Sequence, residues 1–244
     1  MNILSIGNSF SQDAQRYLHE IAKADAYSLD SFNLHIGGCS LWRHYRNMLS
    51  EEKTYFLEVN GKNTGFKVSL KEALLNREWD VITVQQVSRK APYYDTYQPY
   101  LNKITEYVRQ YVPKAKIAVH QTWAYEQDSL RLNAELGYKN YTDMLDDIVV
   151  SYKKAADEIN ADFIIPSGEV FHKLIVSGIK KVHRDTFHAS YGLGRYTLGL
   201  LWYAMLTGND IKDNTFSDFD EEISQSEIEL SKLCVTQICN IQNN

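Results

Sequence analysis

The sequence has few cysteines, few prolines and no excess of positive charge, and each shortage excludes a class of protein. Its 3 cysteines among 244 residues are an odd set without metal-site spacing, which favours a reducing compartment over a disulfide-stabilised fold. With only 4 prolines and no Pro-, Gly- or Ser-rich stretch, the chain offers no linker. We therefore expect residues 1–244 to form a single domain, which this length allows.

The charge balance and the lack of long apolar runs argue against two kinds of partner. A formal net charge of −5 disfavours a general affinity for nucleic acid or for an anionic membrane. No apolar run approaches the length of a transmembrane helix. The amino-terminus lacks the basic start and long apolar stretch of a signal peptide, which predicts a cytoplasmic protein, or a secreted or periplasmic one if a signal was removed before residue 1. No feature indicates an oligomeric state.

Apolar strand-like runs alternate with longer helical stretches along the whole chain, the pattern of a parallel sheet covered by helices. The expected strands are residues 2–6, 28–36, 80–86, 116–120 and 162–165. The expected helices are residues 12–24, 41–49, 69–78, 100–111, 141–160, 169–178, 191–206 and 221–238. This alternation predicts an α/β protein with a flavodoxin-like, three-layer α/β/α sandwich, a parallel sheet of order 2-1-3-4-5, right-handed crossovers and a carboxyl-terminal helix.

Two local signals add detail to this frame. Asn60-Gly61 lies between two apolar runs and predicts a small β-hairpin inserted near residues 55–68. Ser69 and Glu72 have the spacing of a capping box at the start of a helix. Residues 126–138 are polar and favour neither a helix nor a strand.

Ser9 follows the first strand at a Gly7-Asn8 break, where the strand feeds a helix. In an open α/β sheet this corner lies at the carboxyl end of the strand, where ligands bind. A serine hydroxyl here could attack an acyl carbon, and free backbone N–H groups of the helix start could hold the oxyanion. An ordinary turn with Ser9 or Ser11 as a helix cap is the alternative.

Asp185 and His188 are three positions apart in a polar segment after the fifth expected strand. If this segment makes a helical turn, both side chains lie on one side of it. A carboxylate beside an imidazole orients the ring and stabilises its charged form, so that the ring can take the proton of a serine hydroxyl. Ser9, Asp185 and His188 therefore supply the parts of a hydrolase triad.

At these residues the chain resembles the SGNH (GDSL-type) hydrolases. Gly7-Asn8-Ser9 stands for the Gly-Asp-Ser block of that superfamily, Gly38 for the oxyanion glycine after the second strand, and Asp185-Thr-Phe-His188 for the Asp-x-x-His block. Three segments, residues 6–11, 85–88 and 190–195, look like a little-characterised bacterial branch of it that is labelled a domain of unknown function. The resemblance implies an ester hydrolase with Ser9 as nucleophile.

The chain departs from the superfamily pattern in two places. Asn8 replaces the aspartate before the nucleophile, and the asparagine block after the third strand is absent. An oxyanion hole needs a hydrogen-bond donor rather than asparagine itself. We expect the backbone N–H groups of Ser9 and Gly38 and the side chain of Gln86 to form the hole, with Gln85 or Ser88 as alternatives to Gln86.

The sequence thus predicts a serine esterase that needs no metal and no organic cofactor. The resemblance implies short-acyl esters of the acetyl type, often on carbohydrates, and the aromatic residues expected near the site either stack on a sugar or pack the loops. The candidates for substrate contact are Trp42, Tyr93 and Trp123.

Three other interpretations stay open at this point. His183, Asp185 and His188 could bind a metal, although no fourth ligand stands out. The same fold could bind a nucleotide or phosphate at the turn after the first strand, without the glycine-rich fingerprint of such sites. The altered third block also permits a degenerate hydrolase that binds glycans without cleaving them.

Overall fold

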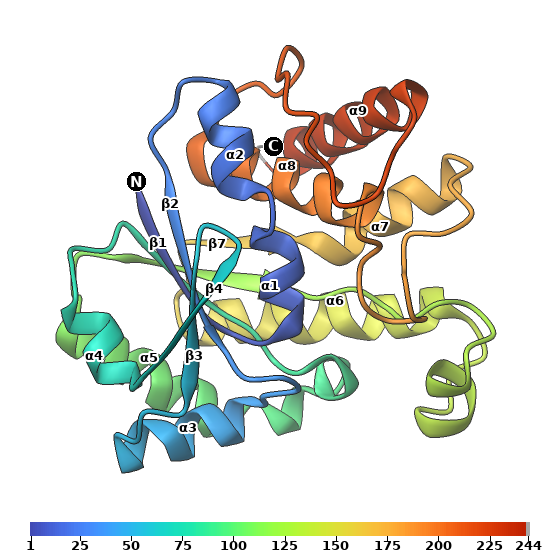
Figure 1. Cartoon of the computed structure of the whole chain (residues 1–244). Helices are drawn as coiled ribbons and strands as arrows, with labels where there is room; N and C mark the ends of the chain where they lie inside the picture. The colour runs from blue at the N-terminus through green and yellow to red at the C-terminus, as the bar shows by residue number, and fades with distance from the viewer. Residues whose placement is uncertain (243–244) are drawn as a thin grey trace.

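A mixed sheet of seven strands lies between two layers of helices in the computed structural model, which describes residues 1–242 (Figure 1). The strands lie in the order β4-β3-β2-β1-β5-β6-β7. Their bounds are β1 Asn2–Gly7, β2 Asp30–His35, β3 Tyr55–Val59, β4 Lys62–Val68, β5 Val81–Val84, β6 Lys116–Gln121 and β7 Phe163–Pro166.

Strands β2, β1, β5, β6 and β7 are parallel, and they form the predicted 2-1-3-4-5 arrangement. The central strands are covered on both faces, so their apolar side chains are buried: Ile3, Leu4 and Ile6 of β1 are at most 1% exposed. Fully covered strands read as continuous apolar runs in the sequence, which is why the pattern located them.

The hairpin of β3 and β4 is present, but it extends the main sheet rather than standing apart as a separate insertion. Strand β3 pairs antiparallel with β2, with Leu57 opposite Leu34. Asn60 and Gly61 both have positive φ values, 51° and 73°, which a two-residue hairpin turn requires. The predicted hairpin is therefore confirmed, and the sheet becomes mixed at this edge.

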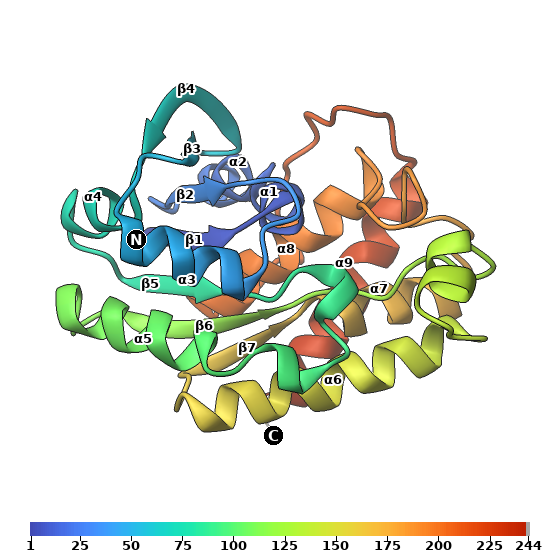
Figure 2. The same cartoon turned by 90° about the horizontal axis from the view of Figure 1, so that it is seen from below.

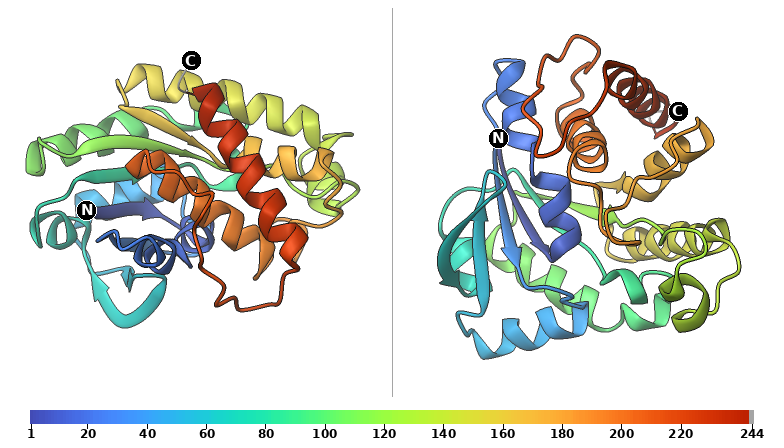
Figure 3. Two further views of the ribbon diagram at one scale, coloured as in Figure 1. Left: turned by 90° about the horizontal axis from the view of Figure 1, so that it is seen from above. Right: turned by 45° about the vertical axis from the view of Figure 1, so that its right-hand side comes forward.

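Two layers of helices cover the sheet. Their bounds are α1 Ser9–Gln15, α2 Leu18–Ala24, α3 Leu41–Ser50, α4 Leu70–Leu75, α5 Tyr100–Tyr111, α6 Tyr141–Glu158, α7 Ser167–Val176, α8 Leu193–Thr207 and α9 Gln225–Gln242. Figures 1 and 2 show α3 to α6 on one face of the sheet. Helices α1, α2, α8 and α9 cover the other face, where α9 crosses α8 in the left panel of Figure 3.

The first helical stretch differs from its prediction in one respect that bears on function. It begins at Ser9 instead of residue 12, and it breaks at Arg16–Tyr17 into α1 and α2. Asn8 is its cap, since the Asn8 Oδ1 atom accepts the backbone N–H of Phe10 at 2.9 Å. Neither Ser9 nor Ser11 is the cap, so the Ser9 hydroxyl is not used to start the helix.

The structure also bears on the predicted capping box and on the polar stretch 126–138. The capping box of Ser69 and Glu72 is present at the start of α4. The polar stretch for which no element was predicted contains a π-helical turn, η3, Arg131–Glu135. Within residues 1–242 no helix has the length and apolar character needed to cross a membrane.

Candidate active site

Ser9 is the first residue of α1, directly after the sharp turn that ends β1. Gly7 permits this turn, because a Cβ atom at Gly7 would lie 2.0 Å from the Oγ atom of Ser11. Asn8 has an extended backbone and caps the helix, which leaves Ser9 half-buried at the helix start. The nucleophile candidate thus sits where unpaired backbone N–H groups and the positive end of the helix dipole converge.

Asp185 and His188 lie in a compact turn between α7 and α8. The turn is closed by a hydrogen bond from the Arg184 N–H to the His188 carbonyl, at 3.0 Å, and by a bridge between His183 and Ala189. Within it, Oδ1 of Asp185 accepts the backbone N–H of His188 at 2.8 Å. The spacing of three residues therefore places both side chains on one side of the turn, as the sequence predicts.

The structure joins Ser9, His188 and Asp185 in one chain of hydrogen bonds. Oδ2 of Asp185 lies 2.7 Å from Nδ1 of His188, and Nε2 of His188 lies 2.8 Å from Oγ of Ser9. An ionised carboxylate only accepts, so Nδ1 carries the ring proton and Nε2 accepts the serine hydroxyl. These two contacts bring Ser9 within reach of a base 179 positions away in the sequence.

The carboxylate of Asp185 is held in its ionised form. Partial burial raises its pKa, but the hydrogen bonds from the His188 ring and backbone N–H outweigh that effect and leave the pKa below its ordinary value. Asp185 therefore stays negative across the neutral range and can stabilise a positive charge on the His188 ring.

Two backbone N–H groups, those of Ser9 and Gly38, are candidates for binding an oxyanion. Within residues 1–242, neither the Ser9 N–H nor the Gly38 N–H has an intramolecular acceptor. Gly38 has φ +61°, a left-handed conformation that favours glycine. The Nδ2 group of Asn8 donates to the Cys39 carbonyl at 3.1 Å, so the Gly38–Cys39 loop is fixed to the turn that precedes Ser9.

Gln86 does not supply the expected third donor, and the structure corrects this prediction. Its side chain is fully buried, and both amide contacts go to Thr96, at 3.0 Å to the carbonyl and 3.2 Å to the hydroxyl. The Gln86 Oε1 atom accepts the backbone N–H groups of Leu41 and Val87. Gln86 thus fastens the start of α3 to the loop after β5.

The two alternatives to Gln86 also have hydrogen-bond partners within the protein. The Gln85 amide donates to Oδ1 of Asn8 at 2.8 Å and accepts from Nδ1 of His120 at 2.8 Å. The Ser88 hydroxyl is paired with the Tyr125 hydroxyl at 2.9 Å. Burial lowers the pKa of His120 to about 3, so this imidazole stays neutral. Its hydrogen bond orients the Gln85 amide, which in turn holds the Asn8 side chain.

Residues 2–237 match the family described as Domain of unknown function (DUF4886). A crystal structure of a DUF4886 family protein from Bacteroides uniformis is 31% identical, with a TM-score of 0.89, and the alignment covers 100% of this chain and 96% of that one. The chain belongs to the DUF4886 family. None of the curated proteins compared with the chain matches it.

Two more distant structures share the fold of this DUF4886 protein. One, from Slackia heliotrinireducens, is described as a candidate SGNH hydrolase; it is 20% identical, covers 84% of this chain and 98% of its own, and has a TM-score of 0.62. The other, a candidate GDSL-like lipase from Parabacteroides merdae, is 14% identical, covers 85% and 95%, and has a TM-score of 0.54. The chain therefore has the fold of SGNH hydrolases, as the sequence motifs indicate.

The three aromatic candidates for substrate contact divide into two groups. Trp42 and Tyr93 are exposed, at 44% and 41%, and are free to contact a ligand. Trp123 is fully buried, so its predicted role as a substrate contact is wrong. It stacks on Phe10 with ring centroids 4.2 Å apart and donates its indole N–H to the Phe187 carbonyl at 2.7 Å. Trp123 thus supports the loop that carries His188.

Two residues that no sequence pattern above indicates lie beside the site: Phe187 packs on His188, and Arg131 packs on Phe187. The Phe187 ring lies 3.9 Å from the His188 ring, and the Arg131 guanidinium lies 4.1 Å above the Phe187 ring centroid. Phe187 stands inside the Asp-x-x-His block and could have been noticed there. Arg131 comes from the polar stretch after β6, and no local pattern connects it with residue 187.

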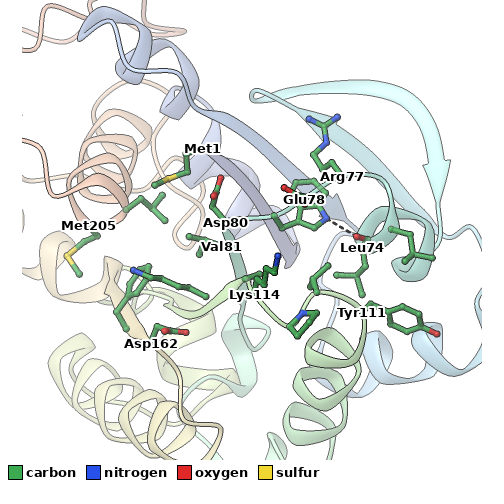
Figure 4. Close-up of a pocket in the computed structure, with 18 of the residues that line it drawn as sticks. Met1, Leu74, Arg77, Glu78, Asp80, Val81, Tyr111, Lys114, Asp162 and Met205 are labelled. Atoms are coloured by element: carbon green, nitrogen blue, oxygen red, sulfur yellow. Dashed lines mark hydrogen bonds between the residues drawn. The ribbon is translucent and has the colours of Figure 1, made fainter.

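A large cleft in the protein is not part of this site. It has a volume of about 1210 Å³ and lies at the amino ends of the strands, between Met1, Tyr111 and Asp162 (Figure 4). A second cavity of about 470 Å³ lies beside the 181–193 segment and includes neither Ser9 nor His188. Ser9 lies just after the carboxyl end of β1, at the opposite end of the strands from the 1210 Å³ cleft.

His183 does not join Asp185 and His188 as a metal ligand. It is buried, which lowers its pKa to about 4, and its Nε2–H donates to the Ala124 carbonyl at 3.1 Å. Within residues 1–242, no three His, Cys, Asp or Glu side chains gather around one point as metal ligands do.

Proposed function

We propose that the protein is a serine esterase that hydrolyses short-acyl esters of the acetyl type, with carbohydrate esters as the first candidates, through Ser9, His188 and Asp185. The observation that supports this most directly is the unbroken hydrogen-bonded chain from Asp185 through His188 to Ser9, at 2.7 and 2.8 Å. These distances lie within the range in which a base takes the proton of a nucleophile. This series of hydrogen bonds ends at Ser9, the first residue of α1. Among the described residues, the backbone N–H groups of Ser9 and Gly38 have no acceptor.

Acylation begins when the Ser9 hydroxyl attacks the ester carbonyl and passes its proton to Nε2 of His188. Asp185 keeps Nδ1 of the ring protonated and stabilises the imidazolium that forms. The carbonyl oxygen becomes an oxyanion, which the N–H groups of Ser9 and Gly38 can bind. His188 then gives the proton to the leaving alcohol, and an acyl-Ser9 intermediate is left.

Deacylation repeats the same steps with water. His188 removes a proton from a water molecule, which attacks the acyl-Ser9 carbonyl and forms a second oxyanion. Collapse of this species returns the proton from His188 to Oγ of Ser9 and releases the acid. Each oxyanion donor is commonly worth a factor of ~100 or more in turnover, so the two backbone N–H groups can stabilise both oxyanions.

The resemblance to SGNH hydrolases favours a small acyl group, and two exposed aromatic rings favour a sugar as the alcohol. The exposed rings of Trp42 and Tyr93 are suited to stacking on a sugar. We therefore place an acetylated carbohydrate first among candidate substrates.

A p-nitrophenyl ester series, from acetate to longer chains, tests this proposal together with an acetylated oligosaccharide. We expect turnover that is fastest with acetate and that is lost in Ser9→Ala. Ser50→Ala is the matched control, because this exposed serine lies at the end of α3 and should keep the wild-type rate. Equal background rates for all proteins would refute the esterase and leave a glycan- or nucleotide-binding protein on the same fold.

A further inference from the structure

Asp13 is a buried carboxylate that the catalytic scheme above does not use. It lies four residues after Ser9 in α1, about one helical turn, and its side chain is 0% exposed. A carboxylate removed from water requires partners for its charge and its lone pairs. Those partners show what Asp13 does.

The partners of Asp13 come from both ends of the turn that carries Asp185 and His188. Nη1 of Arg184 lies 3.0 Å from Oδ1 and 2.9 Å from Oδ2 of Asp13, and the backbone N–H of Ala189 donates to Oδ2 at 3.2 Å. Arg184 also donates to the Ala189 carbonyl. Asp13 therefore ties residues 184 and 189 to the helix that begins with Ser9.

A third partner anchors the carboxylate to α8. Nε of Arg195 lies 2.9 Å from Oδ1 of Asp13, and Nη1 of Arg195 lies 2.8 Å from Asp220, which also binds Arg16. Arg195 closes the 190–195 segment that the sequence resemblance singled out. Figure 1 shows the segment between α7 and α8 descending beside α1, where these contacts form.

We propose that Asp13 is a positioning residue that holds His188 within reach of Ser9. This inference rests on the proposed function. The contact between His188 and Ser9 joins two segments of the chain, and Asp13 is the charged group that clamps them one residue away from His188. A displacement of the base of about 1 Å can cost ~100-fold in rate, so the clamp determines turnover without touching the substrate.

Asp13→Asn, Arg184→Gln and Asp220→Asn, compared with the wild-type protein, test this inference. Asparagine keeps the shape of Asp13 but removes the charge. Arg184→Gln removes only the Arg184 contacts, while Asp13 still binds Arg195 and the Ala189 backbone N–H. Asp220→Asn is the matched control, because Asp220 belongs to the same ionic network but does not contact the 184–189 turn. Active sites are counted by fluorophosphonate titration, so that a loss of folded protein does not count as a loss of rate.

We expect kcat per titrated site to fall ~10- to 100-fold in Asp13→Asn and ~10-fold in Arg184→Gln, with KM within about twofold of the wild-type value. Asp220→Asn should keep its rate per site within about twofold. Because Asp13 acts through His188, Asp13→Asn should cause no further loss in a His188→Ala background. Wild-type rates per site in both Asp13→Asn and Arg184→Gln would overturn the inference and leave a purely structural ion cluster.

A second measurement keeps the inference separate from the proposed function. The proton on Nδ1 of His188, bonded to Asp185, should give a low-field NMR signal in the wild-type protein, and Asp13→Asn should weaken or shift it. An inert wild-type protein that shows this change would refute the esterase but support the clamp. An active wild-type protein with an unchanged signal and unchanged rates in the variants would refute the clamp alone.

Discussion

Asn8→Asp restores the aspartate that the SGNH resemblance associates with this position, and we predict that it damages this protein. Asn8 is 1% exposed and makes three side-chain contacts. Its Oδ1 atom accepts from the Phe10 N–H and the Gln85 amide, which a carboxylate can also do. Its Nδ2 group donates to the Cys39 carbonyl at 3.1 Å, which an ionised carboxylate cannot do.

The expected size of the effect follows from these contacts. The Cys39 carbonyl loses its donor, which costs ~1–3 kcal/mol for a buried group. The Cys39 carbonyl then faces a carboxylate oxygen, and the buried charge raises the cost in folding free energy by several kcal/mol. The helix start and the two retained donors offset part of this, by ~0.3–2 kcal/mol for the helix dipole. We expect a net loss of ~2–4 kcal/mol in the free energy of unfolding, because the costs outweigh the offsets.

The same change should also reduce turnover, because Asn8 fixes the loop that presents the Gly38 N–H. Displacing one oxyanion donor commonly costs ~100-fold, so we expect kcat on p-nitrophenyl acetate to fall between 10- and 100-fold. The assay compares kcat per fluorophosphonate-titrated site in wild type, Asn8→Asp and Asn8→Ala. Asn8→Ala is the control, since it removes the same donor without adding a charge.

The stability of Asn8→Asp should depend on pH in a definite direction. A carboxyl group at position 8 can donate to the Cys39 carbonyl only when it is protonated, so its pKa in the folded state should be raised. The penalty is then present at high pH and disappears as the pH falls. The difference in Tm between wild type and Asn8→Asp should shrink from pH 8 to pH 5, while that of Asn8→Ala stays constant. Wild-type Tm and kcat in Asn8→Asp, or a Tm difference that grows on acidification, would refute the reasoning.

Three further predictions concern residues that support the site. Gln86→Ala should lower the free energy of unfolding by ~3 kcal/mol, because it leaves buried backbone groups unpaired, yet keep kcat per site within about tenfold; a ~100-fold loss would make Gln86 an oxyanion donor after all. Burial lowers the pKa of His44, His120 and His183 to about 3, 3 and 4. The unfolded chain binds more protons below pH 6.5, so stability should fall by ~2 kcal/mol per histidine from pH 7 to pH 5 in denaturant titrations; a flat profile would contradict this. Trp123→Phe should lower kcat rather than raise KM, since the indole supports the loop and touches no substrate; a pure KM effect would contradict the buried role.

The strand order and the hydrogen-bonded group of Ser9, His188 and Asp185 could be predicted because each rests on a local pattern. Central strands that are covered on both faces appear as apolar runs, and the first and last motifs carry Ser9, Asp185 and His188 at fixed short spacings. The Asn60-Gly61 turn likewise has a backbone requirement that few other sequences meet. These features need only a few neighbouring residues to be recognised.

The errors concern contacts between segments far apart in the chain. Gln86 was expected to point into the site, but its partners Leu41 and Thr96 lie in two other segments, and no local rule reveals them. Trp123 follows a strand at the active edge, yet its ring turns inward against Phe10. The role of Asp13 depends on Arg184 and Arg195, which lie more than 170 positions away.

The central claim is that Ser9 is a nucleophile activated by His188. The most direct measurement is the intact mass of the protein after treatment with a fluorophosphonate, followed by peptide mapping, in wild type, Ser9→Ala and His188→Ala. We expect a single adduct on Ser9 in the wild-type protein, no adduct in Ser9→Ala, and labelling slowed at least ~100-fold in His188→Ala, because the general base is lost. An unlabelled wild-type protein, or a label on another serine, would contradict the account.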